Sequence, residues 1–228
     1  MVLANCRIGE RKETSQTLYE LEIEAIANRV RQALPDATDL LASAGRLVKL
    51  YEGARGYMLV DAVASRRRNY DTRVVGPNGI LTKYRALAPA GSIAELARAP
   101  LDGIGLMESE PETLRVLAAK FAELQTSLGT SNEEETCLAW GRLPSGDPRV
   151  SSFLEVHGIG PALLEYLRML CGADTIKVDV RVLKNLESLG LPVSELQVSG
   201  VYRACQEIAA KAGCTLTELD QLLWNLAF

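Results

Sequence analysis

The stretch Phe153–Leu170, FLEVHGIGPALLEYLRML, predicts two helices joined by a very tight turn. Gly158 and Gly160, on either side of Ile159, permit backbone conformations and close approaches that a Cβ atom would prevent. Pro161 suits the first turn of the helix that follows. The N–H groups at the start of that helix can bind an anion such as a DNA phosphate. On its own, the same pattern also fits a simple connection between two helices.

A second feature follows nineteen residues after Gly160, where Asp179 stands within the segment 174–186, DTIKVDVRVLKNL. Val182 and Leu186 have helical spacing behind it, so Asp179 is predicted to be an N-cap. Capping alone explains an aspartate at this position. The same position keeps Asp179 ionised, because a helix N-terminus favours the anion.

Length and composition indicate a globular protein with a sizeable core. The chain has 228 residues, of which 47% are hydrophobic and 24% charged. This excludes a disordered chain, a collagen and a disulfide-stapled miniprotein, and the length corresponds to roughly 1.5 domains of ordinary size. The net charge of −4 argues at first against nucleic-acid binding, whose usual footprint is basic.

The charge is unevenly distributed along the chain. Between Arg46 and Arg98 there are ten Lys or Arg and four acidic residues, a balance of +6, so the rest of the chain carries −10. Arginine outnumbers lysine 18 to 7, and its planar guanidinium is the better partner for phosphates and base edges. On charge alone, a solvated face with salt bridges to the acidic parts is the favoured interpretation.

Helical periodicity dominates and strand-type alternation is almost absent, which predicts an all-α protein with about ten or more helices. The clearest helical segments are 14–34, 37–51, 56–69, 110–128 and 215–228. Capping-box spacing occurs at Ser131–Glu134 and Thr215–Glu218. Asp61 lies in an otherwise apolar run. It is either a buried polar group near a binding pocket or a residue on the outer helix face, and the outer face is favoured.

The cysteine pattern and the lack of long apolar runs indicate an intracellular protein. The five cysteines are odd in number and form no CxxC pair, and the polar start, MVLANCRIGERKE, is unlike a secretion signal. No apolar run approaches the ~20 residues that span a bilayer. We therefore expect free thiols, no membrane association, and a cytoplasmic or nucleoid location in a prokaryote or a nuclear one in a eukaryote.

The hairpin and the aspartate segment together resemble the helix-hairpin-helix DNA glycosylase superfamily (HhH-GPD), which includes endonuclease III, MutY-type adenine and alkylpurine glycosylases. In that family the hairpin is approximately LPGVGxxTA, and a VDxHV segment with the catalytic aspartate follows. Here Gly158–Gly160 matches the hairpin and Val178–Val182 matches the aspartate segment. Tyr57–Arg68 matches an early family helix more weakly, with Arg66 in place of a glutamine.

The resemblance implies an all-α fold of two lobes with a cleft between them. Residues 51–169 form a central lobe that ends in the hairpin, and residues 1–50 with 170–228 form a second, discontinuous lobe. It also implies a DNA N-glycosylase that acts as a monomer on double-stranded DNA with a damaged or mismatched base. The base is flipped out, and Asp179 stabilises the charge that develops on the sugar and activates water.

Departures from the family pattern narrow the expected chemistry. Bifunctional members carry a Schiff-base lysine where this chain has Ala162, so AP-lyase activity is not expected. Only Cys205 and Cys214 follow Asp179, so neither an iron–sulfur cluster nor another metal is expected. A monovalent cation at the hairpin backbone is the one ion that the resemblance leaves open. His157 replaces a proline and is expected at the surface.

The implied DNA contacts come from the hairpin and from arginines, namely Gly158, Ile159, Gly160, Ala162, Arg66, Arg67, Arg68 and Arg181. Tyr57, Asp61 and Tyr166 are candidates for the base pocket, although core packing is the commoner role of such tyrosines. No motif indicates the lesion. A non-catalytic or damage-sensing DNA-binding protein and a helical protein-interaction domain are alternatives compatible with the same residues.

Overall fold

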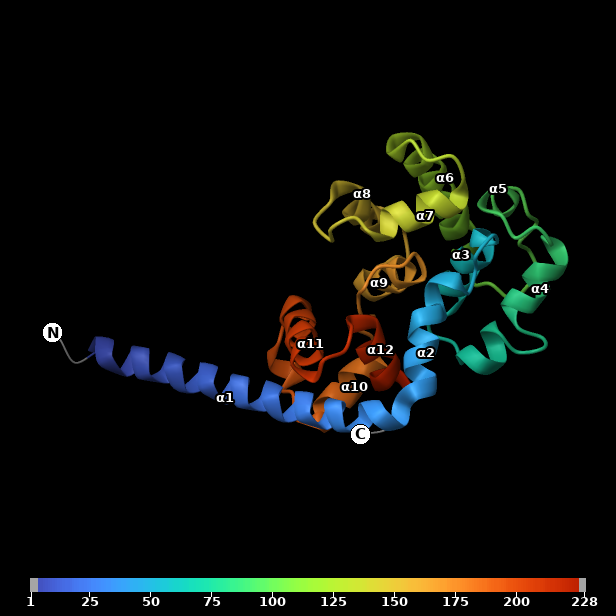
Figure 1. Cartoon of the computed structure of the whole chain (residues 1–228). Coiled ribbons are helices and arrows are strands. Elements are labelled where there is room, and N and C mark those ends of the chain that lie inside the picture. Colours follow the sequence, from blue (N-terminus) through green and yellow to red (C-terminus); the bar gives the residue numbers. More distant parts are fainter. Residues whose placement is uncertain (1–3, 226–228) are drawn as a thin grey trace. The chain divides into compact units, whose positions relative to one another are not determined.

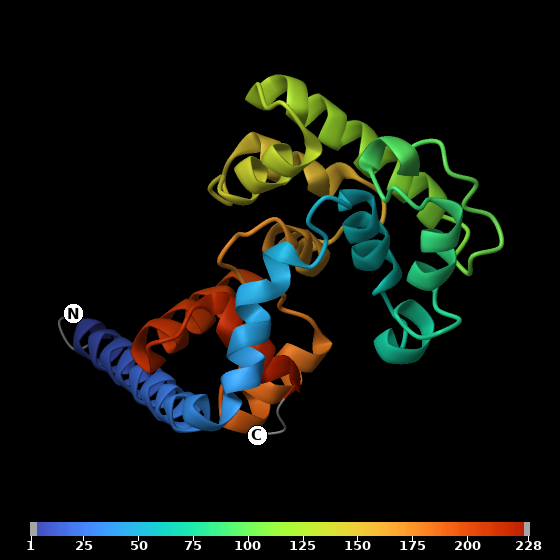
Figure 2. The same cartoon turned by 45° about the vertical axis from the view of Figure 1, so that its right-hand side comes forward.

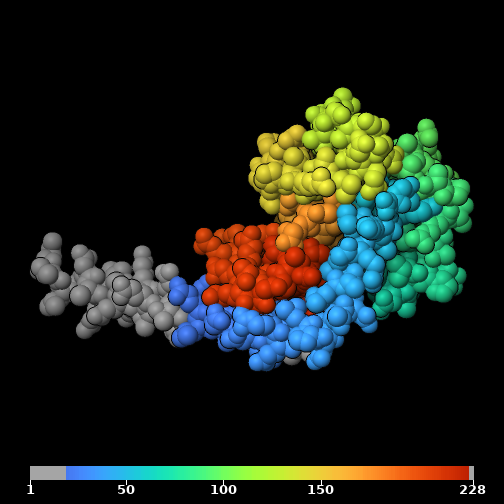
Figure 3. All heavy atoms as spheres, in the orientation of Figure 1, coloured from blue at the N-terminus to red at the C-terminus, as the bar shows by residue number. Residues whose placement is uncertain are grey.

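The computed structural model describes the backbone of residues 4–225 and the side chains of residues 19–225. Residues whose side chains are not described are grey in Figure 3. All regular secondary structure in this described part is helical, which confirms the all-α fold class (Figure 1). The chain divides into two compact units. Unit 1 comprises Met1–Gly45 and Val178–Phe228, and unit 2 comprises Arg46–Lys177.

Unit 2 is built around α3 (Arg55–Ala64), in which every residue except Tyr57 is buried. Helix α3 packs against α4 (Ile80–Leu87), α5 (Ile93–Leu96), α6 (Glu110–Leu128), α7 (Glu133–Gly141) and α9 (Pro161–Leu170). The rings of Phe121, Trp140 and Phe153 lie 4.6–5.3 Å apart in the same core. Because Phe153 immediately precedes the hairpin, this aromatic cluster anchors one arm of it.

Unit 1 is a smaller helical assembly around α1 (Ala4–Ala33) and α11 (Val198–Ala212), which run side by side in Figures 1 and 2. Helix α12 (Leu216–Asn225) packs on both α10 (Val180–Leu189) and α11. The other helical elements are α2 (Thr38–Arg46), α8 (Pro148–Ser151), η1 (Leu34–Ala37), η2 (Leu47–Lys49), η4 (Ser152–Glu155), η5 (Val193–Glu195) and a π-helical turn, η3 (Tyr70–Val74).

The predicted helices agree with the structure best where the signal is local. The segment 110–128 matches α6 at both ends, whereas 37–51 divides into α2 and η2. The segment 56–69 was expected to stay helical to its end, but α3 ends at Ala64. Arg67 has φ = 51°, a left-handed conformation that an α-helix does not contain. The last three residues of the segment 215–228 lie outside the described residues.

Two predicted capping boxes had different outcomes. The box at Thr215 is confirmed, because Thr215 Oγ1 accepts the Glu218 N–H at 3.1 Å and Glu218 Oε2 accepts the Thr215 N–H at 2.8 Å. The box at Ser131 is wrong by one residue. Asn132 caps α7 instead and accepts the Glu135 N–H at 2.9 Å, since asparagine is at least as good an N-cap as serine.

The described residues were also compared with the expectations for cysteines, membrane spans and metal sites. Cys137, Cys171 and Cys205 are free thiols, whereas the side chain of Cys6 lies outside the described residues. None of the described helices combines the length and apolar character needed to cross a bilayer. No group of three or more His, Cys, Asp or Glu side chains among residues 19–225 is placed to hold a metal ion.

Candidate nucleic-acid interface

The hairpin between η4 and α9 is a tight turn fixed by its own backbone. The Ile159 N–H donates to the Val156 carbonyl at 2.9 Å, and Gly158 at the tip has φ = +85°. Only glycine adopts that conformation without strain. The side chains of Val156 and Ile159 are buried, so the turn is anchored in the core of unit 2 while its tip faces outward.

Gly160, in contrast, is not required to be glycine by its conformation or its packing. A Cβ atom added there would meet nothing within 4 Å, and its backbone is extended with φ = −97°. No contact between described residues therefore requires glycine at this position. Pro161 occupies the first turn of α9 as predicted, and no described side chain caps the helix. The first N–H groups of α9 are thus open to an anion from outside.

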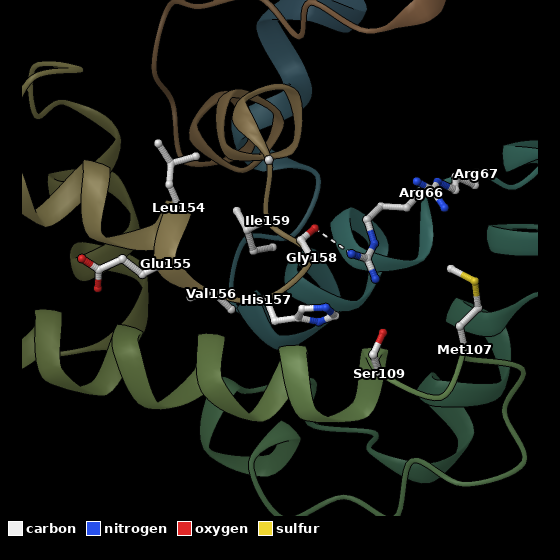
Figure 4. A pocket seen from close by; sticks show the side chains of 11 residues that line it. Arg66, Arg67, Met107, Ser109, Leu154, Glu155, Val156, His157, Gly158 and Ile159 are labelled. Carbon is white, nitrogen blue, oxygen red and sulfur yellow. Dashed lines mark hydrogen bonds between the residues drawn. The ribbon is translucent and has the colours of Figure 1, made fainter.

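A pocket of about 580 Å³ lies on this face of unit 2, and we call it the hairpin pocket (Figure 4). It is lined by residues 154–160 together with Arg66, Arg67, Met107 and Ser109. Figure 4 shows Leu154 and Met107 on opposite sides of it, with the His157 ring near Ser109. His157 is exposed, as predicted. The lining thus combines backbone groups with cationic and hydroxyl side chains, and it also includes the carboxylate of Glu155.

Two of the three consecutive arginines bind a carboxylate inside the protein. Glu110 is fully buried, and Arg68 donates to both of its oxygens at 2.8 and 2.7 Å. Arg66 Nη2 lies 3.4 Å from the same carboxylate, which also accepts the Met107 N–H at 2.8 Å. The basic end of the segment 56–69 is therefore turned partly inward, because the two guanidinium groups offset the burial of Glu110.

Arg66 also reaches the tip of the hairpin. Its Nη1 donates to the Gly158 carbonyl at 2.6 Å, the dashed contact in Figure 4. A Cβ atom at position 158 would lie 2.0 Å from that nitrogen, so the close contact needs glycine as well. Arg66 thus positions the hairpin. Arg67 is the exposed member of the three arginines, and it lines the hairpin pocket.

These placements predict different effects for neighbouring arginines. Arg68→Ala should lower the free energy of unfolding by about 3 kcal/mol, because it leaves a buried carboxylate with one cation fewer. Arg67→Ala should change the free energy of unfolding by less than about 0.5 kcal/mol. Chemical denaturation measures both values. Equal effects of the two substitutions on stability would contradict the assignment.

Asp179 is the N-cap of α10, as the sequence predicted. Its Oδ1 accepts the N–H groups of Arg181 at 2.9 Å and Val182 at 3.1 Å. The carboxylate is half-buried at the positive end of the helix, so its orientation is fixed by backbone. Arg181 is exposed, and its guanidinium lies 4.3 Å from the centroid of the Trp224 ring. Both Arg181 contacts lie within unit 1.

Asp61 forms a polar cluster inside unit 2, which we call the Asp61 cluster. Asp61 is fully buried, so the interpretation that placed it on the outer helix face is wrong. The Tyr166 hydroxyl donates to its Oδ2 at 2.8 Å, and Lys177 Nζ lies 4.5 Å from the Tyr166 ring centroid. Burial raises the pKa of Asp61, while the nearby hydroxyl groups of Tyr166, Tyr70 and Tyr51 act in the opposite direction.

Tyr57 is separate from this cluster. Its hydroxyl donates to the carbonyls of Ala88 at 2.8 Å and Pro89 at 3.0 Å, and its ring stacks edge-on against Tyr84 with centroids 5.7 Å apart. Arg85 lies over the same ring. Of the three residues predicted for the base pocket, Asp61 and Tyr166 are therefore in contact, whereas Tyr57 binds the loop after α4. Sequence analysis missed Tyr51 and Tyr70, since scattered tyrosines give no periodic signal.

Comparison with known proteins gives one structural likeness. No family model matches the sequence, and no curated protein matches it. The solved structure of the 8-oxoguanine DNA glycosylase from Methanocaldococcus jannaschii matches with a TM-score of 0.49 and 14% sequence identity, over 90% of this chain and 92% of that one. At this level the likeness carries no statement about activity, so the functional argument rests on the residues themselves.

Proposed function

We propose that this protein is a monofunctional DNA N-glycosylase that flips a damaged or mismatched base out of double-stranded DNA and hydrolyses its N-glycosidic bond. The observation that carries the proposal is the open start of α9. Gly160 has free space over its backbone, and the exposed Arg67 lines the same pocket. The proposal is also supported by the segment Val178–Val182, which resembles the segment with the catalytic aspartate in the helix-hairpin-helix glycosylases.

In this proposal the hairpin holds a phosphate of the DNA backbone. The N–H groups from Gly160 to Ala162, excluding Pro161, point at the anion, and the partial positive charge of the helix end attracts it. Gly158 and Ile159 shape the tip, and Arg67 contributes an exposed cation. Arg66 and Arg68 do not contact the DNA in this proposal but position the hairpin. Arg66 binds the carbonyl of Gly158, and both arginines bind the buried carboxylate of Glu110.

Asp179 is proposed as the catalytic carboxylate. The bond between the anomeric carbon and the base nitrogen breaks with its electron pair leaving on the base, and positive charge develops on the sugar. The carboxylate stabilises this charge and accepts a proton from the water that adds to the anomeric carbon. The two backbone N–H groups that hold Oδ1 fix the direction of the carboxylate.

The structure also bears on DNA affinity. Of the ten basic residues between Arg46 and Arg98, Arg55 is buried against Glu134, and Arg66 and Arg68 are engaged with Glu110. The other seven are exposed. The usable cationic surface is therefore smaller than the sequence balance suggests, and we expect modest, salt-sensitive affinity for undamaged duplex DNA.

A panel of duplexes tests the proposal directly. It carries uracil, hypoxanthine, alkylpurines, oxidised guanine and mismatches, and base release is measured as strand breakage after alkali treatment. Release from at least one duplex is the expected result. Salt-dependent binding without any release would instead identify a non-catalytic DNA-binding protein. Absence of both would identify a protein-interaction domain in which the hairpin is only a turn.

The chain should lack AP-lyase activity by the hairpin route. A Schiff base needs an amine at the abasic sugar, and position 162 carries alanine. Borohydride should therefore trap no covalent complex with abasic DNA, and strands should stay intact until alkali is added. Ala162→Lys supplies the amine as a positive control. A trapped adduct of the wild-type protein would contradict the monofunctional assignment and point to another lysine, such as Lys177.

A further inference from the structure

Only one of the two carboxylate oxygens of Asp61 accepts a hydrogen bond. The side chain is fully buried and Oδ2 accepts the Tyr166 hydroxyl, whereas Oδ1 has no hydrogen-bond partner. A buried acceptor left unpaired is destabilising, and more so when it is charged. The neighbouring residues of α3, at 58–60 and 62–64, are all apolar and buried, so packing alone would favour a hydrophobic side chain here. The unpaired Oδ1 therefore indicates a use outside the fold.

Hydroxyl groups surround this carboxylate. Tyr70 and Tyr51 lie close enough to lower the pKa of Asp61, but neither makes a hydrogen bond of ordinary geometry to Oδ1. Tyr51 is buried, whereas Tyr70 and Tyr166 are half-buried, so the Asp61 cluster reaches the surface of unit 2 through two tyrosine rings. Rotation of either ring is a small side-chain movement. The cluster can thus offer an acceptor and neighbouring hydroxyl donors to a planar ligand.

We infer that the Asp61 cluster recognises the flipped base and selects bases that present an N–H next to a carbonyl, the lactam edge. This inference rests on the proposed glycosylase function. Oδ1 of Asp61 accepts the N–H, and the hydroxyl of Tyr51 or Tyr70 donates to the carbonyl. Uracil, thymine, guanine and hypoxanthine have this edge. Adenine and cytosine instead present a ring nitrogen acceptor beside an amino group, and that acceptor would oppose the carboxylate.

Free bases test the site independently of catalysis. Hypoxanthine and adenine are a matched pair, since the two purines differ only at the edge in question. We expect hypoxanthine to bind the wild-type protein at least about 10-fold more tightly than adenine, which is about 1.4 kcal/mol. Asp61→Asn should remove that preference, and Asp102→Asn, at an exposed position of unit 2, should keep it. Equilibrium dialysis gives the affinities.

Thermal unfolding separates recognition from a structural role. Because burial raises the pKa of Asp61 in the folded protein, its contribution to stability falls as the pH rises above the unfolded-state pKa and through the folded-state pKa. Asp61→Asn removes this loss, so the variant should be at least as stable as the wild type at neutral pH. A marked loss of stability, or failure of the variant to fold, would show that the fold needs the carboxylate and overturn the inference.

The remaining outcomes separate this inference from the proposed function. Base release from the duplex panel without a preference for hypoxanthine over adenine overturns the Asp61 assignment and leaves the glycosylase proposal standing. A hypoxanthine preference that Asp61→Asn abolishes, without base release from any duplex, supports the site and overturns the glycosylase proposal. Unchanged hypoxanthine binding by Asp61→Asn overturns the inference, whatever the catalytic result.

Discussion

Asp179→Asn is expected to lower the rate of base release by at least about 1,000-fold, which is about 4 kcal/mol of transition-state stabilisation. Asparagine keeps the side-chain oxygen that accepts the N–H groups of Arg181 and Val182, and it is an equally good N-cap. The substitution therefore removes negative charge and the proton acceptor while the start of α10 stays capped. Folding and DNA affinity should stay at wild-type values.

Single-turnover release from the best duplex of the panel, together with thermal unfolding, measures this result. Asp147→Asn is a matched control, because Asp147 caps α8 through the Arg149 N–H at 2.8 Å. This control should release base at the wild-type rate. Wild-type release by Asp179→Asn would remove the carboxylate from the mechanism, and a large loss of stability would reduce its role to capping.

Gly160→Glu should weaken binding to duplex DNA by about 100-fold, equivalent to about 2.7 kcal/mol. A Cβ atom at this position would meet nothing within 4 Å and the residue is exposed, so the protein should fold normally. The new carboxylate stands at the start of α9, where the phosphate is proposed to bind, and like charges in contact cost several kcal/mol. Fluorescence anisotropy with a labelled duplex at fixed salt gives the affinity.

Two further variants isolate the cause of that loss. Gly146→Glu adds the same charge at another glycine of unit 2 whose Cβ atom would meet nothing within 4 Å, and it should bind DNA nearly as the wild type does. Gly160→Lys keeps the steric block but reverses the charge, so its loss should be smaller than that of Gly160→Glu. Wild-type affinity of both position-160 variants would identify the hairpin as a simple helix connection.

Features that depend on neighbouring residues were predictable from the sequence. The bounds of α6, the N-cap role of Asp179 and the place of Pro161 at the start of α9 all follow from short-range rules. These rules concern backbone groups within one helical turn of the residue. They succeed because the competing tertiary interactions do not change which N–H groups a helix end leaves unpaired.

The direction of charged side chains was not predictable in the same way. Three consecutive arginines suggest a basic face, yet two of them turn toward Glu110, which lies more than forty residues later in the chain. Asp61 looked like an outer-face residue because the tyrosines that surround it are distant in sequence. Burial of a charge depends on partners that only the tertiary structure brings together.

The buried carboxylate of Glu110 joins three separate segments, since it binds Arg66 and Arg68 after α3 and the backbone before α6, and Arg66 in turn holds the tip of the hairpin. The tip is consequently pre-organised. A loop that is already ordered loses little conformational entropy when it binds a ligand. The Ile159 amide, which donates to the Val156 carbonyl, should therefore exchange slowly with solvent deuterium even without DNA, whereas the open amides of Gly160 and Ala162 should be slowed only when a phosphate binds.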